Sequence, residues 1–218
     1  MATAETGRPT RGEKRRVAIE RAAIDEFMAH GVAGASMARI AAAAGVSRPA
    51  LYQYYRDKRA VLAASFVNIL DQRVEAALTA LAEPGTVAEQ LDGFLQRYEG
   101  DLWEQMSASE HTGEIIDAKD AGMRSEMSAT EERRRVALLT YFESVDPGDS
   151  QTQRAMRASW VELLGLAPRG LWADEPTVEA FRQRLTTLAV VFAASVESNR
   201  NRHKQPSPGS ERRDSPAT

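Results

Sequence analysis

The 218-residue sequence contains no cysteine and only three histidines. Without cysteine there is no disulfide framework, no thiol nucleophile and no thiolate zinc site. The histidines, His30, His111 and His203, lie far apart and lack the spacing of metal ligands. We therefore expect no metal site and no other cofactor.

Long apolar runs are absent as well. No stretch approaches the ~20 apolar residues that a membrane-spanning helix needs, and the N-terminus lacks the apolar segment of a signal peptide. The sequence also shows no nucleophile with a partner base, no phosphate-cradling glycine loop and no carboxylate pair in a supporting context. These absences predict a soluble cytoplasmic protein that is not an enzyme.

Charge is distributed unevenly along the chain. Residues 1–58 carry ten Lys/Arg and six Asp/Glu, a net charge of +4, and residues 59–218 carry eighteen and twenty-five, a net charge of −7. A positive segment suits contact with phosphates. Chance scatter explains the asymmetry equally well on its own, so the charge gains meaning only beside a motif.

The most informative segment is residues 36–58, SMARIAAAAGVSRPALYQYYRDK. Ser36 is typical of a helix N-cap, and Ile40 and Ala44 lie on one face of the helix that would follow. Gly45 stands where that helix must end, since glycine adopts a positive φ at little steric cost. A short helix followed by a tight turn is therefore predicted.

A second short helix follows the turn. Ser47 is placed to cap it, and Pro49 falls in its first turn, where a missing N–H does no harm. Leu51 is expected to point into the core, and three tyrosines follow it at positions 52, 54 and 55. The two helices and their turn predict a helix-turn-helix, whose second helix lies in the major groove of DNA.

These residues resemble the DNA-binding segment of the TetR family of bacterial transcriptional regulators. That segment has a Thr or Ser opening the second helix, then Ile-Ala-x-x-Ala-Gly-Val-Ser, then Leu-Tyr-x-His/Tyr-Phe, then a Lys and a Leu. The matching positions here are Ser36, Ile40-Ala41, Ala44-Gly45-Val46-Ser47, Leu51-Tyr52, Tyr54-Tyr55, Lys58 and Leu62. The departures are Ser for Thr at 36, Tyr for His at 54 and Tyr for Phe at 55, and none removes a hydrogen-bonding group. The resemblance covers residues 14–63.

The resemblance implies an all-α fold of about nine helices, which agrees with the helical periodicity of the chain. An N-terminal three-helix DNA-binding domain would precede a larger helical domain for effector binding and dimerisation. The expected limits are a disordered basic arm at 1–12, the DNA-binding domain at 13–57, the effector and dimerisation domain at 58–199, and a disordered tail at 200–218.

Periodicity and capping signals predict the individual helices. The first covers 13–30, and the later ones cover 58–81, 87–105 and 123–145, with a short helix or loop over 111–119. A further helix starts at 151 and is expected to kink or end at Pro168 and Gly170, and the last covers 174–198. The run Glu131 to Arg135 is interpreted as a solvated helix face with an i,i+4 ion pair between its end residues.

Roles at DNA follow from side-chain type. Arg48 is the predicted base reader, because arginine forks onto the O6 and N7 atoms of guanine. Weaker contacts to base edges are predicted for Ser47, Pro49 and Gln53. Phosphate contacts that set the register are predicted for Ser36, Tyr52, Tyr54 and Lys58. Tyr55 is expected to pack inward, as the family's Phe does.

A ligand pocket is expected between the helices that follow residue 58. Its candidate lining residues are Phe66, Leu70, Phe94, Tyr98, Trp103, Met106, Ile115, Met123, Met127, Tyr141 and Trp160, with Glu99, His111 and Glu114 as polar candidates. Each apolar candidate would serve equally well as plain core. The sequence does not name the effector.

The last predicted helix is apolar around much of its circumference from Leu185 to Val196, so it must bury more than one face. A crowded core within one chain and an interface between two chains both satisfy that requirement. The resemblance implies that the last two helices pair with their mates into a four-helix bundle. The predicted interface residues are Met156, Leu163, Leu164, Phe181, Leu185, Leu188 and Phe192.

The sequence thus favours a ligand-responsive transcriptional regulator, a repressor in the first instance, although activation stays open. It would bind a palindromic DNA operator as a homodimer and leave it when a small-molecule effector binds. An enzyme is disfavoured by the missing catalytic groups. A helical interaction module that has lost DNA binding is disfavoured by the retained Ser47-Arg48, Tyr52, Tyr54 and Lys58.

Overall fold

The computed structural model describes residues 10–204, apart from the side chains of 119–122, 124, 203 and 204. Every regular element in this range is helical: ten α-helices and one π-helical turn. Residues 87–107 are helical without a break, so counting them as one helix gives nine within the described range. The predicted all-α class is confirmed. No helix in this range is both long and apolar enough to cross a bilayer.

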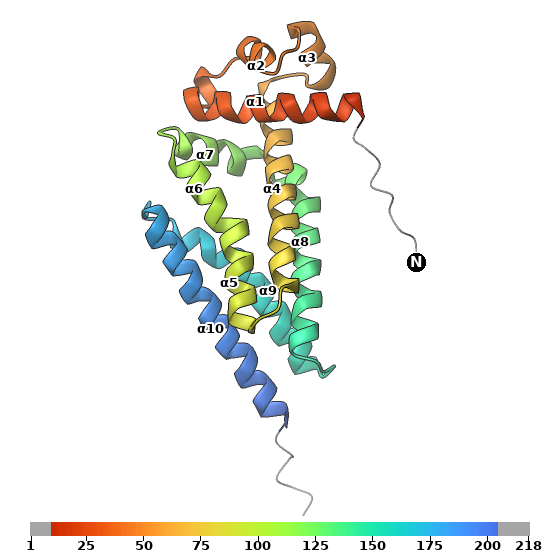
Figure 1. Ribbon diagram of the computed structural model, residues 1–218, viewed down its shortest axis with the longest axis vertical. Coiled ribbons are helices and arrows are strands. Elements are labelled where there is room, and N and C mark those ends of the chain that lie inside the picture. The colour runs from red at the N-terminus through yellow and green to blue at the C-terminus, as the bar shows by residue number, and fades with distance from the viewer. Residues whose placement is uncertain (1–9, 205–218) are drawn as a thin grey trace, which may run out of the picture.

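The first helix, α1 (Arg11–Gly34), lies across one end of the molecule (Figure 1). Thr10 caps it, because its hydroxyl accepts from the Glu13 amide while the Glu13 carboxylate accepts from the Thr10 amide. The helix is longer than the predicted 13–30. It continues through Gly31, whose φ of 67° kinks it near its end. Residues 11 and 12 of the expected arm are therefore helical, and residues 1–9 lie outside the described range.

Two short helices, α2 (Met37–Ala43) and α3 (Arg48–Tyr54), form the predicted helix-turn-helix (Figure 1). Ser36 and Ser47 are their N-caps, and each hydroxyl accepts a hydrogen bond from the backbone amide three residues further on. Gly45 in the turn has a φ of 66°, the left-handed conformation for which glycine was predicted.

One apolar core joins this helix-turn-helix to the helix that follows. α4 (Lys58–Ala82) runs down the length of the molecule from the end that carries α1–α3 (Figure 1). Fully buried side chains from α1, α2, α3 and α4 belong to the same hydrophobic cluster: Ile19, Phe27, Ile40, Leu51, Val61 and Leu62. Any tilt of α4 will therefore move the DNA-binding helices with it.

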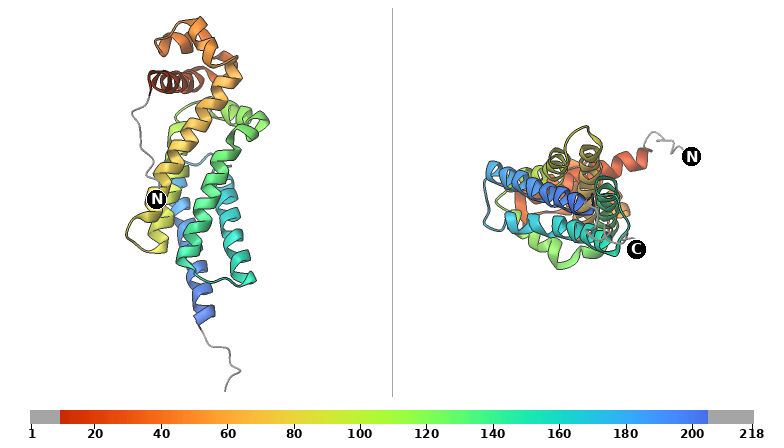
Figure 2. Two further views of the ribbon diagram at one scale, coloured as in Figure 1. Left: turned by 90° about the vertical axis from the view of Figure 1, so that its right-hand side faces the viewer. Right: turned by 90° about the horizontal axis from the view of Figure 1, so that it is seen from below.

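The rest of the chain forms an elongated helical bundle with α4 on one side of it (Figure 2). Its members are α5 (Val87–Leu95), the π-helical turn η1 (Gln96–Gly100), α6 (Asp101–Ser107), α8 (Arg124–Val145), α9 (Gln151–Leu171) and α10 (Val178–Lys204). α7 (Thr112–Gly122) crosses beneath α1 and contacts it (Figure 1). The segment expected to be a short helix or a loop is thus an eleven-residue helix.

Three helix limits differ from those predicted. α9 continues through Pro168 to Leu171, because Leu164 and Pro168 are both buried in the core and that packing outweighs the hydrogen bond that proline lacks. α10 begins at 178 rather than 174, since the Thr177 hydroxyl accepts from the Ala180 amide as a helix cap. α10 also extends to 204, so residues 200–204 of the expected tail are helical, and 205–218 lie outside the described range.

Candidate DNA interface and ligand cavity

α3 presents an exposed polar and aromatic face at one end of the molecule. The predicted contact residues Ser47, Arg48, Pro49, Tyr52, Gln53 and Tyr54 are all exposed there. Tyr52 and Tyr54 expose 43% and 37% of their surface, although tyrosine is usually much more buried. The predicted DNA-contact residues of α3 thus form one exposed surface. Packing in the protein core does not account for the positions of these side chains.

Arg48 and Tyr52 are neighbours one helical turn apart. The Arg48 guanidinium carbon lies 5.7 Å from the centre of the Tyr52 ring, within range of a cation–π contact. This contact limits the freedom of an exposed arginine at the first position of α3. A guanidinium held in this way loses less conformational entropy when it binds a base.

The other two predicted DNA residues are only half exposed. Ser36 is occupied as the cap of α2, and its own amide donates to Glu26 at 3.0 Å. Lys58 donates from Nζ to the carbonyl oxygens of Ala33 and Ala35, at 3.0 and 3.1 Å. Since an ammonium has three donors, Lys58 retains one for a phosphate. Its bonds to the end of α1 were not foreseen from the sequence.

A buried polar cluster holds the DNA-binding helices together. Tyr55 is buried, as expected, and its hydroxyl donates to Glu20, which is 5% exposed. Arg16 donates to the same carboxylate at 3.0 Å, and Asn68 of α4 donates at 2.8 Å. Burial, followed by the Glu20 carboxylate, raises the pKa of Tyr55. We call Arg16, Glu20, Tyr55 and Asn68 the Glu20 cluster; a single acidic residue on the apolar face of the first helix was its only sequence signal.

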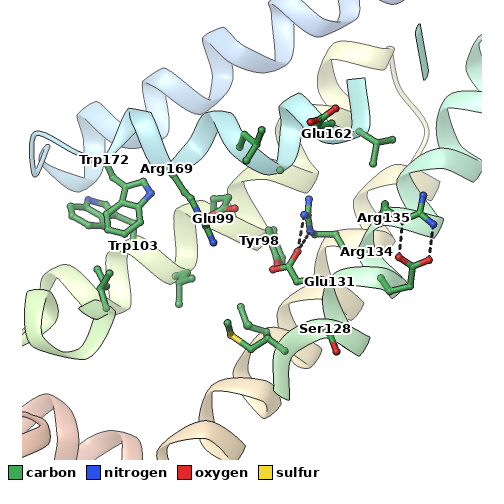
Figure 3. Close-up of a pocket in the computed structure, with 18 of the residues that line it drawn as sticks. Tyr98, Glu99, Trp103, Ser128, Glu131, Arg134, Arg135, Glu162, Arg169 and Trp172 are labelled. Atoms are coloured by element: carbon green, nitrogen blue, oxygen red, sulfur yellow. Dashed lines mark hydrogen bonds and ion pairs between the residues drawn. The ribbon is translucent and has the colours of Figure 1, made fainter. Parts of the chain in front are cut away.

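A cavity of about 750 Å³ lies between α8 and α9 and reaches η1, α6, α7 and α4. This volume is in the range that small-molecule sites occupy. Six sequence candidates line it: Leu70, Tyr98, Glu99, Trp103, Met106 and Met127. Aromatic rings close one end, where Trp103 lies 5.6 Å from Trp172 and 5.7 Å from Phe181 between ring centres (Figure 3).

Other candidates do not line this cavity, which corrects the sequence prediction. Phe66 and Ile115 border a separate void of about 10 Å³, too small for a ligand. Phe94 stacks behind Tyr98 at 5.9 Å between ring centres, and Met123 is buried in the core. The sequence pattern of these apolar side chains is that expected of pocket residues, but the side chains pack in the core between the helices.

Two further aromatic candidates are held away from the cavity by hydrogen bonds. The Tyr141 hydroxyl donates to Gln90 at 2.8 Å, and burial raises the pKa of Tyr141 to about 12. The indole of Trp160 donates to Ser195 of α10 at 3.0 Å. Both rings therefore fix neighbouring helices to each other rather than face a ligand.

His111 and Glu114, the remaining polar candidates, lie at the junction of α7 with α1. Glu114 accepts from the Ala33 amide at 2.6 Å, and Ser109 donates to the Met28 carbonyl at 2.6 Å. Gly31 is needed there, because a Cβ at this position would lie 2.2 Å from the Glu114 carboxylate and 3.1 Å from the His111 ring. The junction ties the body of the molecule to the end of α1.

The charged run from Glu131 to Arg135 is solvated, as interpreted, at Glu132, Arg133 and Arg135, but the predicted ion pair and the exposure of Arg134 were wrong. Glu131 pairs with Arg134 and Glu132 pairs with Arg135, both at i,i+3 and at 2.8 and 2.6 Å, instead of the expected pairing of the end residues. The Arg134 side chain is only 11% exposed, and its guanidinium lies 5.4 Å from the centre of the Tyr98 ring. Glu131 lies beside Arg134 at the cavity, and both residues line it (Figure 3). The sequence analysis did not identify either of them as a lining residue.

Burial and charge oppose each other at Arg134. Burial is the largest single influence and works to lower the pKa of the guanidinium, but the charges of Glu131, Tyr98 and Glu99 and the hydrogen bond to Glu131 together outweigh it and raise the pKa overall. The same cavity wall is completed by Glu162, Leu166 and Arg169 of α9 and by Trp172 just after it, which the sequence analysis did not single out. Their positions depend on how α9 packs, which no local pattern encodes.

The predicted dimer residues divide into three groups. Leu164, Phe181, Leu185 and Phe192 are at most 7% exposed and lie in the core of their own chain, so the prediction that they meet a second chain is wrong. Met156 and Leu188 are half-buried against that core. Leu163 is 51% exposed, and three further apolar side chains of α9 and α10 share its exposure: Leu166, Val190 and Val191.

Residues 19–65 match the family model described as bacterial regulatory proteins, tetR family. This match spans most of α1, all of α2 and α3 and the start of α4, which includes every residue of the exposed α3 face. None of the curated protein sequences matches the chain significantly.

Solved structures resemble the chain over nearly its whole length. FadR from Bacillus halodurans has a TM-score of 0.58 at 21% identity, and the match covers 84% of this chain and 97% of that one. A tetR-family regulator from Streptomyces coelicolor has a TM-score of 0.55 at 19% identity, with coverage of 91% and 92%. FadR from Bacillus subtilis, solved with stearoyl-CoA, has a TM-score of 0.56 at 16% identity, with coverage of 79% and 96%.

At these identities the structural matches establish a shared fold, while the family model identifies the DNA-binding segment. The geometry agrees with both, because the helix-turn-helix is intact and its second helix is exposed. Residues 19–65 thus resemble the bacterial regulatory proteins of the tetR family, and the chain as a whole shares the fold of solved tetR-family regulators.

Proposed function

We propose that the chain is a ligand-responsive repressor, which binds a palindromic operator as a homodimer and releases it when a small molecule fills the cavity. The observation that carries the proposal is the combination of an exposed α3 face with a cavity that reaches α4, the helix that shares an apolar core with α3. Leu70 of α4 lines the cavity, and Val61 and Leu62 of the same helix belong to the core of the DNA-binding helices.

Sequence reading is assigned to α3. Arg48 is exposed at its first position and is proposed to read a guanine in each half-site. Tyr52, Tyr54 and the free donor of Lys58 are proposed to contact phosphates, which set the register on the duplex. One short helix reads few bases, so two-fold pairing on a palindrome is the economical way to gain specificity.

Dimerisation is assigned to the outer faces of α9 and α10. The apolar side chains of Leu163, Val190 and Val191 are each more than half exposed in the single chain and do not line the cavity. Together they supply apolar area that a partner would remove from water. A second copy of the chain is the proposed partner, because a dimeric regulator matches the two-fold symmetry of an operator.

Coupling between ligand and DNA follows from the helices that the cavity touches. Its lining includes Leu70 of α4, Met106 of α6 and Ile116 of α7. α4 shares the core of the DNA-binding helices, and α7 is bonded to the end of α1 through Glu114. A ligand that binds better to a state with a different α4 tilt will draw the two recognition helices out of register with the grooves.

The structure of FadR from Bacillus subtilis contains stearoyl-CoA, so at least one protein with this fold accommodates a small molecule with an apolar chain. This precedent supports the assignment of the cavity as an effector site. It does not identify the effector of this chain, whose own cavity lining decides that question.

Selection of fragments from sheared genomic DNA of the source organism, on the purified protein at near-physiological salt, tests the proposal. A few enriched palindromic sequences are the expected result. Light scattering of the same sample should give twice the chain mass of 23.9 kDa. Recovery of random fragments only, or a monomer mass at micromolar concentration, would contradict the proposal.

A further inference from the structure

The cavity has two chemically different sides. Its side toward α4, α6, α7 and the start of α8 is apolar and is formed by Leu70, Leu102, Met106, Ile116 and Met127. Its opposite side, between α8 and α9, carries three guanidinium groups, those of Arg134, Arg135 and Arg169, beside the apolar side chains of Leu139, Val161 and Leu166. A ligand that fills the whole cavity must therefore combine an apolar body with a polar group.

Arg134 is the most deeply placed of these arginines. Its Nε and Nη2 atoms donate to the same Glu131 oxygen, at 3.0 and 2.8 Å. Among the described residues, its Nη1 atom has no hydrogen-bond partner. A guanidinium carries five N–H donors, so Arg134 keeps donors for a ligand without giving up Glu131.

A glycine brings Arg134 close to α9. A Cβ at Gly165 would lie 2.9 Å from the Arg134 Nη2 atom, so any larger residue would push the guanidinium back toward α8. In Figure 3, Arg134 reaches from α8 toward α9, and Arg169 extends from α9 into the cavity toward Glu99. The two guanidinium groups thus line the same cavity from opposite helices.

Carboxylates also line the cavity, but they differ from one another in their partners and exposure. Glu131 and Glu132 each form an ion pair with an arginine, and the Glu162 side chain is exposed. The Glu99 charge acts on Arg134 and on Arg73 beneath the cavity, whose Nε atom is buried without a partner in the described part of the chain. A cationic ligand would have to compete with arginines for these carboxylates, whereas an anionic ligand uses donors that are not yet taken.

We propose that the effector is an amphiphilic carboxylate. Its apolar chain or ring would pack against Leu70, Met106 and Met127, and its carboxylate would accept hydrogen bonds from Arg134 and Arg169. This inference rests on the proposed effector role of the cavity and specifies the chemistry of that site. A carboxylate suits the pair because guanidinium and carboxylate match in shape as well as charge.

Three probes with the same ten-carbon chain test the head group: decanoate, decanol and decyltrimethylammonium. Binding to the full-length protein is measured by calorimetry and by tryptophan fluorescence, since Trp103 and Trp172 line the cavity. We expect decanoate to bind about a hundredfold tighter than decanol, about tenfold for the charge-assisted hydrogen bond from each of the two arginines, with the cation weakest.

Matched variants locate the preference. Arg134→Gln and Arg169→Gln should each reduce the decanoate preference about tenfold while leaving decanol affinity unchanged. Arg133→Gln is the control, because Arg133 neighbours Arg134 on α8 but pairs with Asp71 at 3.0 Å and does not line the cavity. Thermal unfolding verifies that each variant is folded, and the exposed Arg169 keeps the test valid if Arg134→Gln does not fold.

Equal binding of decanoate and decanol, tighter binding of the cation, or a preference that survives both variants would overturn the inference. Measuring operator binding with the same preparation distinguishes a wrong effector class from a wrong proposed function. A protein that binds its operator but shows no carboxylate preference is a regulator with another effector class. A protein that binds no operator in the absence of any probe contradicts the regulatory function itself.

Discussion

The DNA-binding helices and the cavity treat buried charge in opposite ways. In the first region Glu20 is buried with three donors, from Arg16, Tyr55 and Asn68. In the second region Arg134 is nearly buried with one carboxylate partner, and some of its donors are unused among the described residues. A fully satisfied polar group fixes one arrangement, whereas a partly satisfied one is ready to bind something else. This difference distinguishes helices α1–α3, which we call the reading head, from the helices that line the cavity.

The two regions also differ in how their functional residues are gathered. The exposed α3 face comes from residues 47–54 alone. The cavity combines side chains from Leu70 to Phe181, which lie on six different α-helices, the π-helical turn and the segment after α9. A surface built from one short segment depends on local structure, while a cavity built from many segments depends on how they pack.

The largest expected effect concerns the core that supports the reading head. Phe27 of α1 is fully buried against the neighbouring helices, so Phe27→Ala should lower the free energy of unfolding by about 3–5 kcal/mol. Urea denaturation followed by circular dichroism measures this loss. Tyr52→Ala serves as the control, because its exposed ring leaves little packing to lose. A loss below 1 kcal/mol for Phe27→Ala, on the same order-of-magnitude scale, would mean that the core is not as described.

The Glu20 cluster gives the next largest effect. Glu20→Leu leaves the Tyr55 hydroxyl and the Asn68 amide without their acceptor, so we expect it to cost about 1–3 kcal/mol of stability. Tyr55→Phe, which introduces the residue typical of the family, removes only one of the donors and should cost about 0.5–1.5 kcal/mol. Denaturation curves for both variants rank the two losses. The reverse ranking would show that the cluster is held mainly by the tyrosine.

Arg48→Ala tests the reading head without touching its core. We expect operator binding to weaken by about 1–3 kcal/mol, through one base position in each half-site, while binding to random DNA is unchanged. Gel-shift titrations on the selected operator and on a scrambled duplex measure both quantities. Equal loss on the two duplexes would refute base reading by Arg48.

Lys58 should have the smallest effect on sequence preference. Lys58→Met is expected to weaken every DNA sequence alike and to flatten the dependence of log affinity on log salt by about one. Titrations at four salt concentrations give this slope. An unchanged slope would mean that Lys58 only holds the carbonyl oxygens of Ala33 and Ala35 and does not reach a phosphate.

The contrast between the regions explains what the sequence could predict. Caps, a turn glycine and short helices are local features, and Ser36, Gly45 and Ser47 behave as expected. The long helices followed their signals less closely: Gly31 interrupts α1 with a φ of 67° but the helix resumes to Gly34, and α9 passes through Pro168 and ends at Leu171, one residue after Gly170. Local rules therefore describe the reading head better than the long helices.

The cavity lay beyond local rules. An aromatic residue such as Trp160 has the same pattern whether it lines a cavity or bonds to another helix, as it does to Ser195. The sequence of the run Glu131 to Arg135 does not show that Arg134 turns inward, because the packing of α9 over α8 determines that orientation. Four of the seven predicted dimer residues lie in the core for the same reason, since a helix that is apolar on several sides does not indicate which side its own chain covers.

The most direct test of the account is the affinity of the purified protein for its selected operator, relative to a scrambled duplex of the same length and at the same near-physiological salt. An intact reading head on a dimer predicts an operator preference of at least about a thousandfold. Equal affinity for the two duplexes would contradict the central claim, because it would leave the exposed α3 face as a surface for phosphates alone.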